Sequence, residues 1–376
     1  MKIKKAASNL LGLVSLPAVV YAVFFVVCRM AGSTTFGVGT DLQTIIVNTI
    51  YTGLISLAVS YNLTSGRFDF SVGSVLVLSN IIGFQLALNL GLGPAPTAVI
   101  TSAVGAVLGF ISGMIYVTLQ LPPMVCSLGV AMIYEAIGFI ITKGAGVRLI
   151  GRNDLLVFAT GPAIYILIGV ILAVLVVLLN FTVFGCNCNS LRTGQEISVN
   201  VGINEKKNSV QCYMIAGALM AAAGLINTSR LGTVSVETGL ASSSYIMNAF
   251  LPMFIGGALA KFADRNIGIL AGSFAQACMI SAFGTGKLNF SSNLQTFLSG
   301  LAVLIFMYVS NNSYQLEEAK IFKARRAAAL EELNQKTPYQ TVRAAVICAA
   351  ALLPKEDESY DATPYSYFWF LSGKKI

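Results

Sequence analysis

The chain has 376 residues, of which 56% are hydrophobic and only 11% are charged, with a formal net charge of +8. An ordinary soluble domain carries about 25% charged residues, so this chain lacks the polar surface of a water-soluble globule and is predicted to be a membrane protein. Histidine is absent, which excludes metal sites with histidine ligands, histidine-based catalytic triads and imidazole proton relays.

Ten apolar windows are long enough to cross a bilayer, whose hydrocarbon core of about 30 Å needs about 20 helical residues. In chain order they are Asn9–Met30, Leu42–Tyr61, Ser71–Leu90, Pro96–Val117, Pro123–Thr142, Gly161–Phe184, Ser209–Thr228, Tyr245–Ala260, Ile267–Gly284 and Asn293–Ser310. The third and eighth windows are the weakest, because each is short or interrupted by glycine. The sequence predicts an all-α fold, a polytopic membrane helix bundle of about ten transmembrane helices within residues 1–313.

The charges predict an orientation. With the N-terminus inside, 18 of the 24 Lys and Arg residues fall on the inner side, half of them after residue 313. Inner loops are enriched in Lys and Arg, so both termini are predicted to be cytoplasmic in a multi-pass protein of the cell membrane. Residues 314–376 are predicted to form a cytoplasmic tail, a polar helix with paired Glu and Lys that Pro338 ends, followed by a loosely ordered end.

Small residues recur at helical spacing within the windows, most clearly at Gly105, Gly109 and Gly113. In lipid such residues allow helices to approach closely, and the pattern fits packing within the chain or, alternatively, a dimer contact. The seven cysteines show neither the spacing of zinc ligands nor a disulfide framework. They are predicted to be reduced, including Cys186 and Cys188.

Residues 64–74 separate the second and third windows and read TSGRFDFSVGS. Asp69 or Ser71 is placed to cap the following helix, where it would satisfy free N–H groups and the positive end of the helix dipole. Two interpretations stay open here. One is a capped turn between helices, and the other is a helix break at membrane depth, which requires surrounding protein or a watery cavity.

Two loops stand out by their residue types. The inner loop of residues 191–207 contains Thr193 as a candidate cap, and Ile197 and Val201 lie four residues apart. This spacing indicates a short amphipathic helix that ends at Gly202 and presents an apolar ridge to a soluble partner, with a solvated loop as the alternative. The outer loop of residues 143–154 holds three cations and three glycines, and fits either a contact with an extracytoplasmic partner or a solvated loop.

Ionisable side chains are scarce inside the windows. Glu135 is the clear exception, and an intramembrane carboxylate is a functional candidate by default, whereas Asn80 would hydrogen-bond a polar solute or join helices. No nucleophile–base pair is recognisable, and the nearest match to a phosphate-binding loop, around Gly286 and Lys287, lacks its first glycine and its final Ser or Thr. The chain is predicted not to be an enzyme and to need no cofactor.

Several segments resemble the permease subunits of ABC importers for simple sugars, the ribose, galactose and xylose type that also includes autoinducer and nucleoside permeases. Residues 65–74 (SGRFDFSVGS) resemble the signature Gly-Gly-x-Asp-Leu-Ser-Val-Gly-Ser, and residues 121–129 (LPPMVCSLG) resemble Val-Pro-Pro-Phe-Ile-x-Thr-Leu-Gly. Further blocks match within residues 202–225 and 255–268. The resemblance extends over about residues 40–310.

The chain also departs from that family. Arg67 stands where members often have a small or apolar residue, and Glu135 lies near where many have Arg. Residues 261–265 (KFADR) replace a glycine-rich turn. These differences bear on the solute and on the partners more than on the class.

The resemblance implies a type II importer fold. Two permeases, identical or homologous, would form a dimer in the lipid bilayer, with an ABC ATPase subunit inside, an extracytoplasmic solute-binding protein outside and no nucleic acid. Residues 194–204 would be the coupling helix on the ATPase. The candidate coupling residues are Gly194, Glu196, Ile197, Ser198, Val201, Gly202, Ile203 and Asn204. The candidate residues of the translocation path are Arg67, Asp69, Ser71, Gly73, Ser74, Asn80 and Glu135.

The resemblance therefore predicts a permease that imports a small polar solute, a monosaccharide or a related compound. Two other functions fit the residues. One is a secondary transporter driven by protons through Glu135, and the other is a structural membrane protein in which the tail is the working part.

Overall fold

The computed structural model describes residues 2–30, 32, 36–63, 66–160, 163–260, 264–284, 294, 297–298, 300–305 and 308. Residues 1–298 form one compact unit and residues 299–376 form another. In the second unit, residues 300–305 are helical. The tail predicted for residues 314–376 lies outside the described residues.

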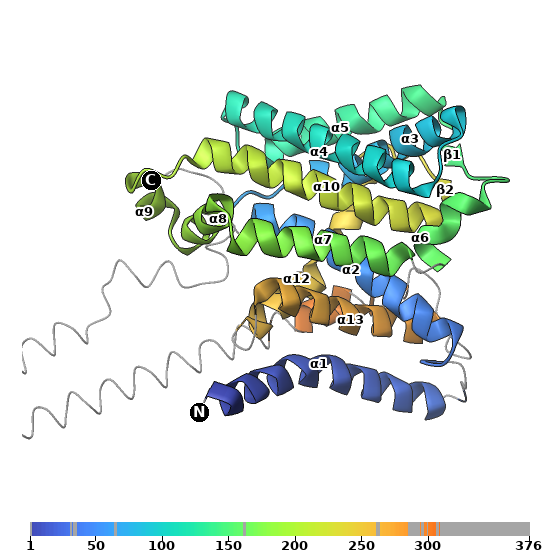
Figure 1. Ribbon diagram of the computed structural model, residues 1–376, viewed down its shortest axis with the longest axis vertical. Coiled ribbons are helices and arrows are strands. Elements are labelled where there is room, and N and C mark those ends of the chain that lie inside the picture. Colours follow the sequence, from blue (N-terminus) through green and yellow to red (C-terminus); the bar gives the residue numbers. More distant parts are fainter. Residues whose placement is uncertain are drawn as a thin grey trace, which may run out of the picture. The chain divides into compact units, whose positions relative to one another are not determined.

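Helices make up most of the described chain (Figure 1). The long helices are α1 (Lys2–Met30), α2 (Thr40–Leu63), α3 (Ser71–Leu90), α4 (Pro94–Leu119), α5 (Pro123–Thr142), α7 (Ala163–Asn180), α10 (Glu205–Leu231) and α13 (Arg265–Gly284). The shorter ones are η1 (Asn153–Leu156), α6 (Val157–Thr160), α8 (Val183–Thr193), α9 (Gln195–Asn200), α11 (Ser243–Met247) and α12 (Phe250–Leu259). Two short strands, β1 (Val147–Arg148) and β2 (Thr233–Val234), pair antiparallel.

Seven of the described helices are long and apolar enough to cross a bilayer, or eight if the bent pair Asn153–Ala159 and Ile164–Leu175 is one span. This confirms a polytopic all-α bundle, and the weak third window forms the well-buried helix α3. The weak eighth window is interrupted at residues 248–249, between α11 and α12, and the stretch Ser243–Leu259 is shorter than the seven spans. Pro252 favours this break, because proline lacks the N–H that would continue the helix from α11. The tenth window, residues 293–310, is described at residues 294, 297–298, 300–305 and 308, all of which are helical.

Helix α10 packs against α2, α3 and α4 within the bundle (Figure 1). Its crossing with α4 is so close that a methyl group added to Gly109 or Gly217 would collide with the backbone of the facing helix. The small residues therefore serve packing within the chain, which was one of the two interpretations of their spacing. Helix α13 packs against α1, α2 and α12.

The long helices run side by side, so the turns gather at two ends of the bundle (Figure 1). We call one the α9 end, because it carries α8, α9 and the starts of α1 and α10. We call the other the β end, because it carries β1, β2 and α6. The predicted inner and outer loops separate in the same way, with Lys206 at the start of α10 and Arg148 in β1. The α9 end is thus the predicted cytoplasmic end.

Candidate functional site

Helix α9 is a six-residue helix that Gly194 separates from α8. The extended backbone of Gly194 (φ −172°, ψ 102°) interrupts the two helices. Its carbonyl oxygen accepts hydrogen bonds from the backbone N–H of Ser198 at 3.0 Å and from the Ser198 hydroxyl at 2.7 Å. Thr193 is the last residue of α8 and not the expected cap of α9. Helix α8 ends at Thr193 because the next residue is Gly194, and glycine is unfavourable inside a helix.

An apolar ridge lies on the exposed face of α9. The side chains of Ile197 and Val201 are 72% and 80% exposed, whereas Ser198 between them is buried. Gly202 follows with φ +101°, a conformation that favours glycine, and its N–H donates to the carbonyl oxygen of Val199 at 2.9 Å. The structure confirms the amphipathic helix predicted from the spacing of residues 197 and 201.

A short turn leads from α9 into α10. The N–H of Ile203 donates to the carbonyl oxygen of Ser198 at 3.1 Å. Asn204 is the N-cap of α10, and its Oδ1 accepts the N–H of Lys207 at 3.0 Å. Asn204 therefore has a structural role of its own as a helix cap. The side chain of Glu196 lies outside the described part of the chain.

Asp69 organises the turn between α2 and α3. Its Oδ1 accepts both the backbone N–H of Ser71 at 2.8 Å and the Ser71 hydroxyl at 2.6 Å, while its Oδ2 accepts the side-chain amide of Asn62 at 3.2 Å. Phe70 stands at the N-cap position of α3 and makes no side-chain cap bond. The Asp69 carboxylate, one residue earlier, instead satisfies the free N–H of Ser71 in the first turn, so the predicted cap role falls to Asp69 from outside the cap position. Burial raises the pKa of Asp69 to about 6, although the hydrogen bonds from Ser71 and Asn62 act in the opposite direction.

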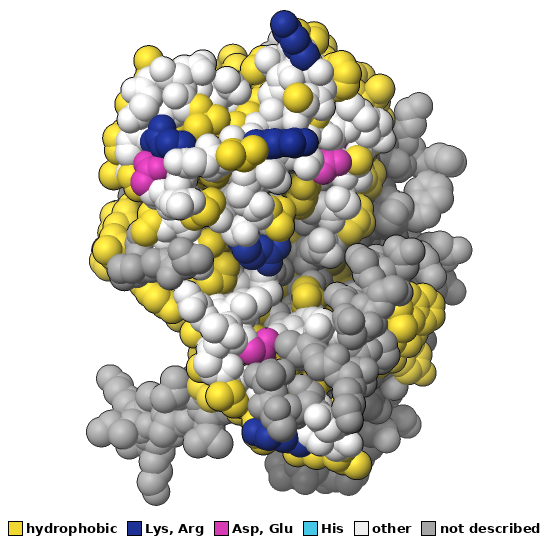
Figure 2. All heavy atoms as spheres, turned by 90° about the vertical axis from the view of Figure 1, so that its right-hand side faces the viewer, with side chains coloured by type: hydrophobic (Ala, Val, Ile, Leu, Met, Phe, Trp, Pro, Cys, Tyr) yellow, Lys and Arg dark blue, Asp and Glu magenta, His cyan; other side chains and the backbone are white. Residues whose placement is uncertain are grey.

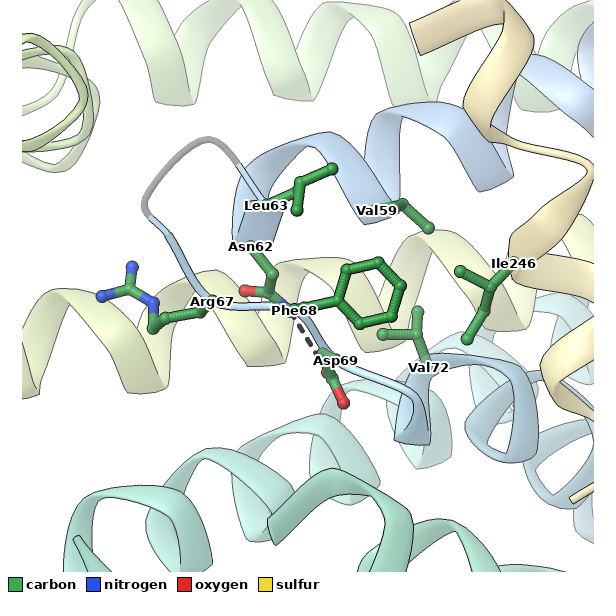
Figure 3. Close-up of a pocket in the computed structure, with 8 residues that line it drawn as sticks. All are labelled: Val59, Asn62, Leu63, Arg67, Phe68, Asp69, Val72 and Ile246. Atoms are coloured by element: carbon green, nitrogen blue, oxygen red, sulfur yellow. Dashed lines mark hydrogen bonds between the residues drawn. The ribbon is translucent and has the colours of Figure 1, made fainter. Parts of the chain in front are cut away.

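A narrow crevice adjoins Asp69, and its free space admits no water molecule. The Phe68 ring lies among Val59, Val72 and Ile246, whereas the Arg67 guanidinium points away from them (Figure 3). The crevice is therefore closed by apolar packing and does not form a solute pocket.

Arg67 connects this turn to α10. Its side chain is almost wholly buried, and Nη1 donates to the Ser209 hydroxyl at 2.6 Å and lies 3.6 Å from Oε1 of Glu205. The same Glu205 oxygen accepts the side-chain amide of Gln195 at 2.7 Å. Gln195 is the first residue of α9, so the contacts reach from the turn to the apolar ridge.

A second cluster holds the segment that precedes α11. The carboxylate of Glu135, buried in α5, accepts the backbone N–H groups of Leu240 at 2.8 Å and Ser242 at 3.0 Å. Leu240 has φ +66°, which is strained for leucine. On the other side, a methyl group at Gly73 in α3 would collide with the Ser242 carbonyl. Glu135 and Gly73 therefore fix the segment that leads into α11.

The remaining candidates for the translocation path lie within helix α3. Ser74 donates to the carbonyl oxygen of Ser71 at 2.8 Å. Asn80 donates to the carbonyl oxygens of Leu76 at 2.8 Å and Ala221 at 3.2 Å, and so joins α3 to α10. The amide of Asn80 fits against Gly224, where a methyl group would collide with it. Asn80 thus serves helix joining, one of its two sequence interpretations.

The seven candidates for the translocation path are all buried, but the structure does not gather them in one place. One group lies around Asp69 and Arg67, Glu135 and Gly73 lie at Ser242, and Asn80 lies apart between α3 and α10. Their part in solute passage stays a prediction. The sequence interpretation missed Gln195, Glu205 and Ser209, although Glu205 was recognisable as an acidic residue in the first turn of α10.

The β end carries the loop predicted to meet an extracytoplasmic partner. Strand β1 pairs with β2, so residues 143–154 include ordered structure as well as exposed side chains. Arg152 forms an ion pair with Asp154 at 2.9 Å and also donates to the carbonyl oxygens of Ala87 and Leu92. Figure 2 looks onto this end and shows Lys, Arg, Asp and Glu side chains spread over it.

Comparison with protein families identifies the class. The family model described as "Branched-chain amino acid transport system / permease component" matches residues 41–307. The match covers well over half of the chain, and the chain belongs to this family of membrane permeases. It also agrees with the range over which the motifs resemble importer permeases.

Three curated relatives specify the class further. The fructose import permease protein FrcC of Rhizobium meliloti is 26% identical over 272 residues, covering 67% of this chain and 72% of the relative. The ribose import permease protein RbsC of Bacillus subtilis (strain 168) is 28% identical over 262 residues, covering 67% and 79%. The autoinducer 2 import system permease protein LsrC of Yersinia pestis (strain Pestoides F) is 25% identical over 227 residues, covering 59% and 63%. No solved structure matches the chain.

Family and relatives together confirm the resemblance carried by residues 65–74 and 121–129. The chain is a permease subunit of the ABC-importer class, not a proton-coupled secondary transporter.

Proposed function

We propose that this subunit imports a simple sugar or a related small polar compound, with the energy supplied by a separate ATPase subunit. The solute class rests on the relatives, whose names are those of fructose, ribose and autoinducer 2 import permeases. A second permease would complete the channel, and a solute-binding protein would deliver the solute at the β end.

The ridge of α9 is the observation that carries this proposal. The apolar side chains of Ile197 and Val201 are exposed at the predicted cytoplasmic end. A contiguous apolar surface of this kind typically marks a site that a partner or lipid covers. A short amphipathic helix with anchors four residues apart fits an apolar groove of a soluble protein. The ATPase is the partner that this class of importer requires at that end.

The scarcity of charged groups inside the bundle agrees with a permease whose energy comes from a separate ATPase subunit. A ligand shifts a conformational equilibrium only as far as it binds one state better than the other. A permease driven by its ATPase therefore needs no tight solute site. Solute specificity would then lie mainly in the binding protein.

Charge substitution on the ridge tests the docking. Ile197→Asp and Val201→Asp should abolish co-purification of the ATPase with the permease, because each buries an unpaired carboxylate in the interface. Asn200→Asp is the matched control, since it adds the same charge to an exposed position of α9 and leaves the ridge intact. Wild-type recovery of ATPase and wild-type uptake in both ridge variants would remove α9 from the docking surface.

A further inference from the structure

Arg67 is a buried cation with incomplete pairing. The residue is 2% exposed, and its Nε and Nη2 have no hydrogen-bond partner among the described residues. Among the described residues Nη1 contacts Ser209 at 2.6 Å and Glu205 at 3.6 Å, and the Cys212 thiol also lies within reach of the guanidinium. Replacing a buried ion pair by apolar groups is often neutral or stabilising, so stability alone does not explain this charge between α2 and α3.

Glu205 is shared between two elements. Its Oε1 accepts the amide of Gln195, the first residue of α9, and also faces Arg67. Gln195 is exposed and Glu205 half-buried, whereas Arg67 is buried. One carboxylate oxygen thus connects the surface helix with the interior of the bundle.

The connection continues into α3. Arg67 stands two residues before Asp69, which caps α3 through Ser71. The guanidinium of Arg67 also contacts the first turns of α10. It donates to the Ser209 hydroxyl, and this hydroxyl donates in turn to the Glu205 carbonyl oxygen at 2.8 Å. A displacement of α9 relative to α10 therefore changes the environment of the residue that leads into α3.

We propose that Arg67 and Glu205 are positioning residues that transmit the movement of α9 to the start of α3 during transport. The proposal rests on the proposed function, in which an ATPase docks on α9.

The contacts of Glu205 allow its carboxylate two alternative partners, Gln195 and Arg67. While Gln195 holds Glu205, the carboxylate stays 3.6 Å from Arg67, beyond the 2.7–2.9 Å of a charge-assisted hydrogen bond. When α9 moves and Gln195 releases Glu205, the carboxylate is free to close on Arg67, whose unused N–H groups allow a bidentate pair. Each state satisfies Glu205 with a different partner, which is the bistable element that coupling requires.

The test measures solute moved per ATP hydrolysed. The permease is purified with the ATPase that accompanies it and placed in proteoliposomes with its solute-binding protein, and radiolabelled ribose and fructose serve as probes. Glu205→Gln and Arg67→Gln should keep the ATPase bound and hydrolysing but lower solute per ATP by about tenfold, the factor expected for one charge-assisted hydrogen bond. The exchange of both charges, Arg67→Glu with Glu205→Arg, should restore part of the ratio.

Two further variants keep the test decisive. Lys206→Gln removes an exposed charge from the neighbouring position and should leave the ratio unchanged. Gln195→Ala changes only an exposed side chain, so it should fold even where the buried variants do not, and it should lower the ratio.

The outcomes separate the two proposals. A wild-type ratio in both Glu205→Gln and Gln195→Ala overturns the transmission role, as does a loss of thermal stability in Glu205→Gln without a change of ratio. Failure of the wild-type permease to retain any ATPase would instead contradict the proposed function.

Discussion

Asp69 is the residue whose chemistry differs most from its ordinary behaviour in water. It lies buried between α2 and α3, and burial raises its pKa to about 6 from a usual value of 3.8. Between these two pH values the folded protein holds a proton that the unfolded chain has released. The contribution of Asp69 to stability is therefore largest below about pH 4, falls as the pH rises to about 6, and is constant above it.

Asp69→Asn tests this dependence. Asparagine keeps an oxygen for the N–H of Ser71 but carries no charge, so the variant should gain stability relative to the wild type as the pH rises from about 4 to about 6. The expected slope is about 1.4 kcal/mol per pH unit. Thermal unfolding in detergent across this range measures it. A difference between the two proteins that is independent of pH would contradict the buried, protonatable state of Asp69.

Glu135 gives the second prediction at this scale. Glu135→Gln replaces one acceptor by a donor opposite a backbone N–H, so the variant should lose about 1–3 kcal/mol of stability. Uptake by the assembled importer should still depend on ATP and resist a protonophore. Uptake driven by a proton gradient alone, and abolished by Glu135→Gln, would contradict the structural role assigned to this carboxylate.

Some of these residues were predictable from the sequence and others were not. The cap at Asp69 and the ridge at Ile197 and Val201 depend on neighbours a few positions away, so their spacing revealed them. The contact of Arg67 with Glu205 joins residues far apart in the chain. The partners of Glu135 are backbone N–H groups, which any residue carries and no sequence pattern marks.

At the scale of elements, α8 was the helix that the sequence interpretation did not anticipate, and it carries an unexpected contact. Sγ of Cys188 lies 3.7 Å from Sγ of Cys212 in α10, and both thiols are free. Hydrogen bonding with Cys212 lowers the pKa of the Cys188 thiol to about 7. The lowered pKa makes the Cys188 thiol more reactive than an ordinary cysteine.

Oxidation by diamide should consequently join α8 to α10. The treated protein should bind two fewer maleimide–polyethylene glycol groups under denaturing conditions than the untreated protein. Cys188→Ser should abolish this loss, whereas Cys186→Ser, at an exposed position two residues away, should preserve it. Equal maleimide binding before and after oxidation would show that the two helices do not approach in this way.

The crossing of α4 and α10 gives a second prediction for elements. Gly109→Ala should destabilise the protein by about 1–3 kcal/mol, because the added methyl group meets the backbone of Tyr213. Gly129→Ala in α5 is the matched control, since nothing lies near the added group and alanine favours a helix. Free energies of unfolding from denaturant titration compare the two variants. Equal stability in both would contradict the close crossing.

For the whole molecule, the separation of loops between two ends predicts where each is accessible. In a variant free of exposed native cysteines, Ile150→Cys at the β end should react with a membrane-impermeant maleimide on intact cells. Val201→Cys on α9 should react only after permeabilisation. Both side chains are largely exposed in the isolated subunit, so in cells that produce the permease without its ATPase the side of the membrane alone decides the result. Reaction of Val201→Cys on intact cells would reverse the predicted orientation.

The hydrophobic composition predicted the long helices of the bundle more readily than the short helices and turns between them. Apolar windows of about 20 residues located most of the long helices, because the bilayer sets their length. The segment before α11 was harder to foresee, since it depends on contacts of Leu240 and Ser242 with α3 and α5, which lie far away in the sequence.

The bare surface of α9 also has a consequence for the cell that makes this subunit. Until another protein covers Ile197 and Val201, each unassembled copy exposes these hydrophobic side chains to chaperones and proteases in the aqueous phase. Surplus copies would then be removed while assembled ones are spared. The abundance of the importer would follow whichever component is scarcest, without any dedicated regulator.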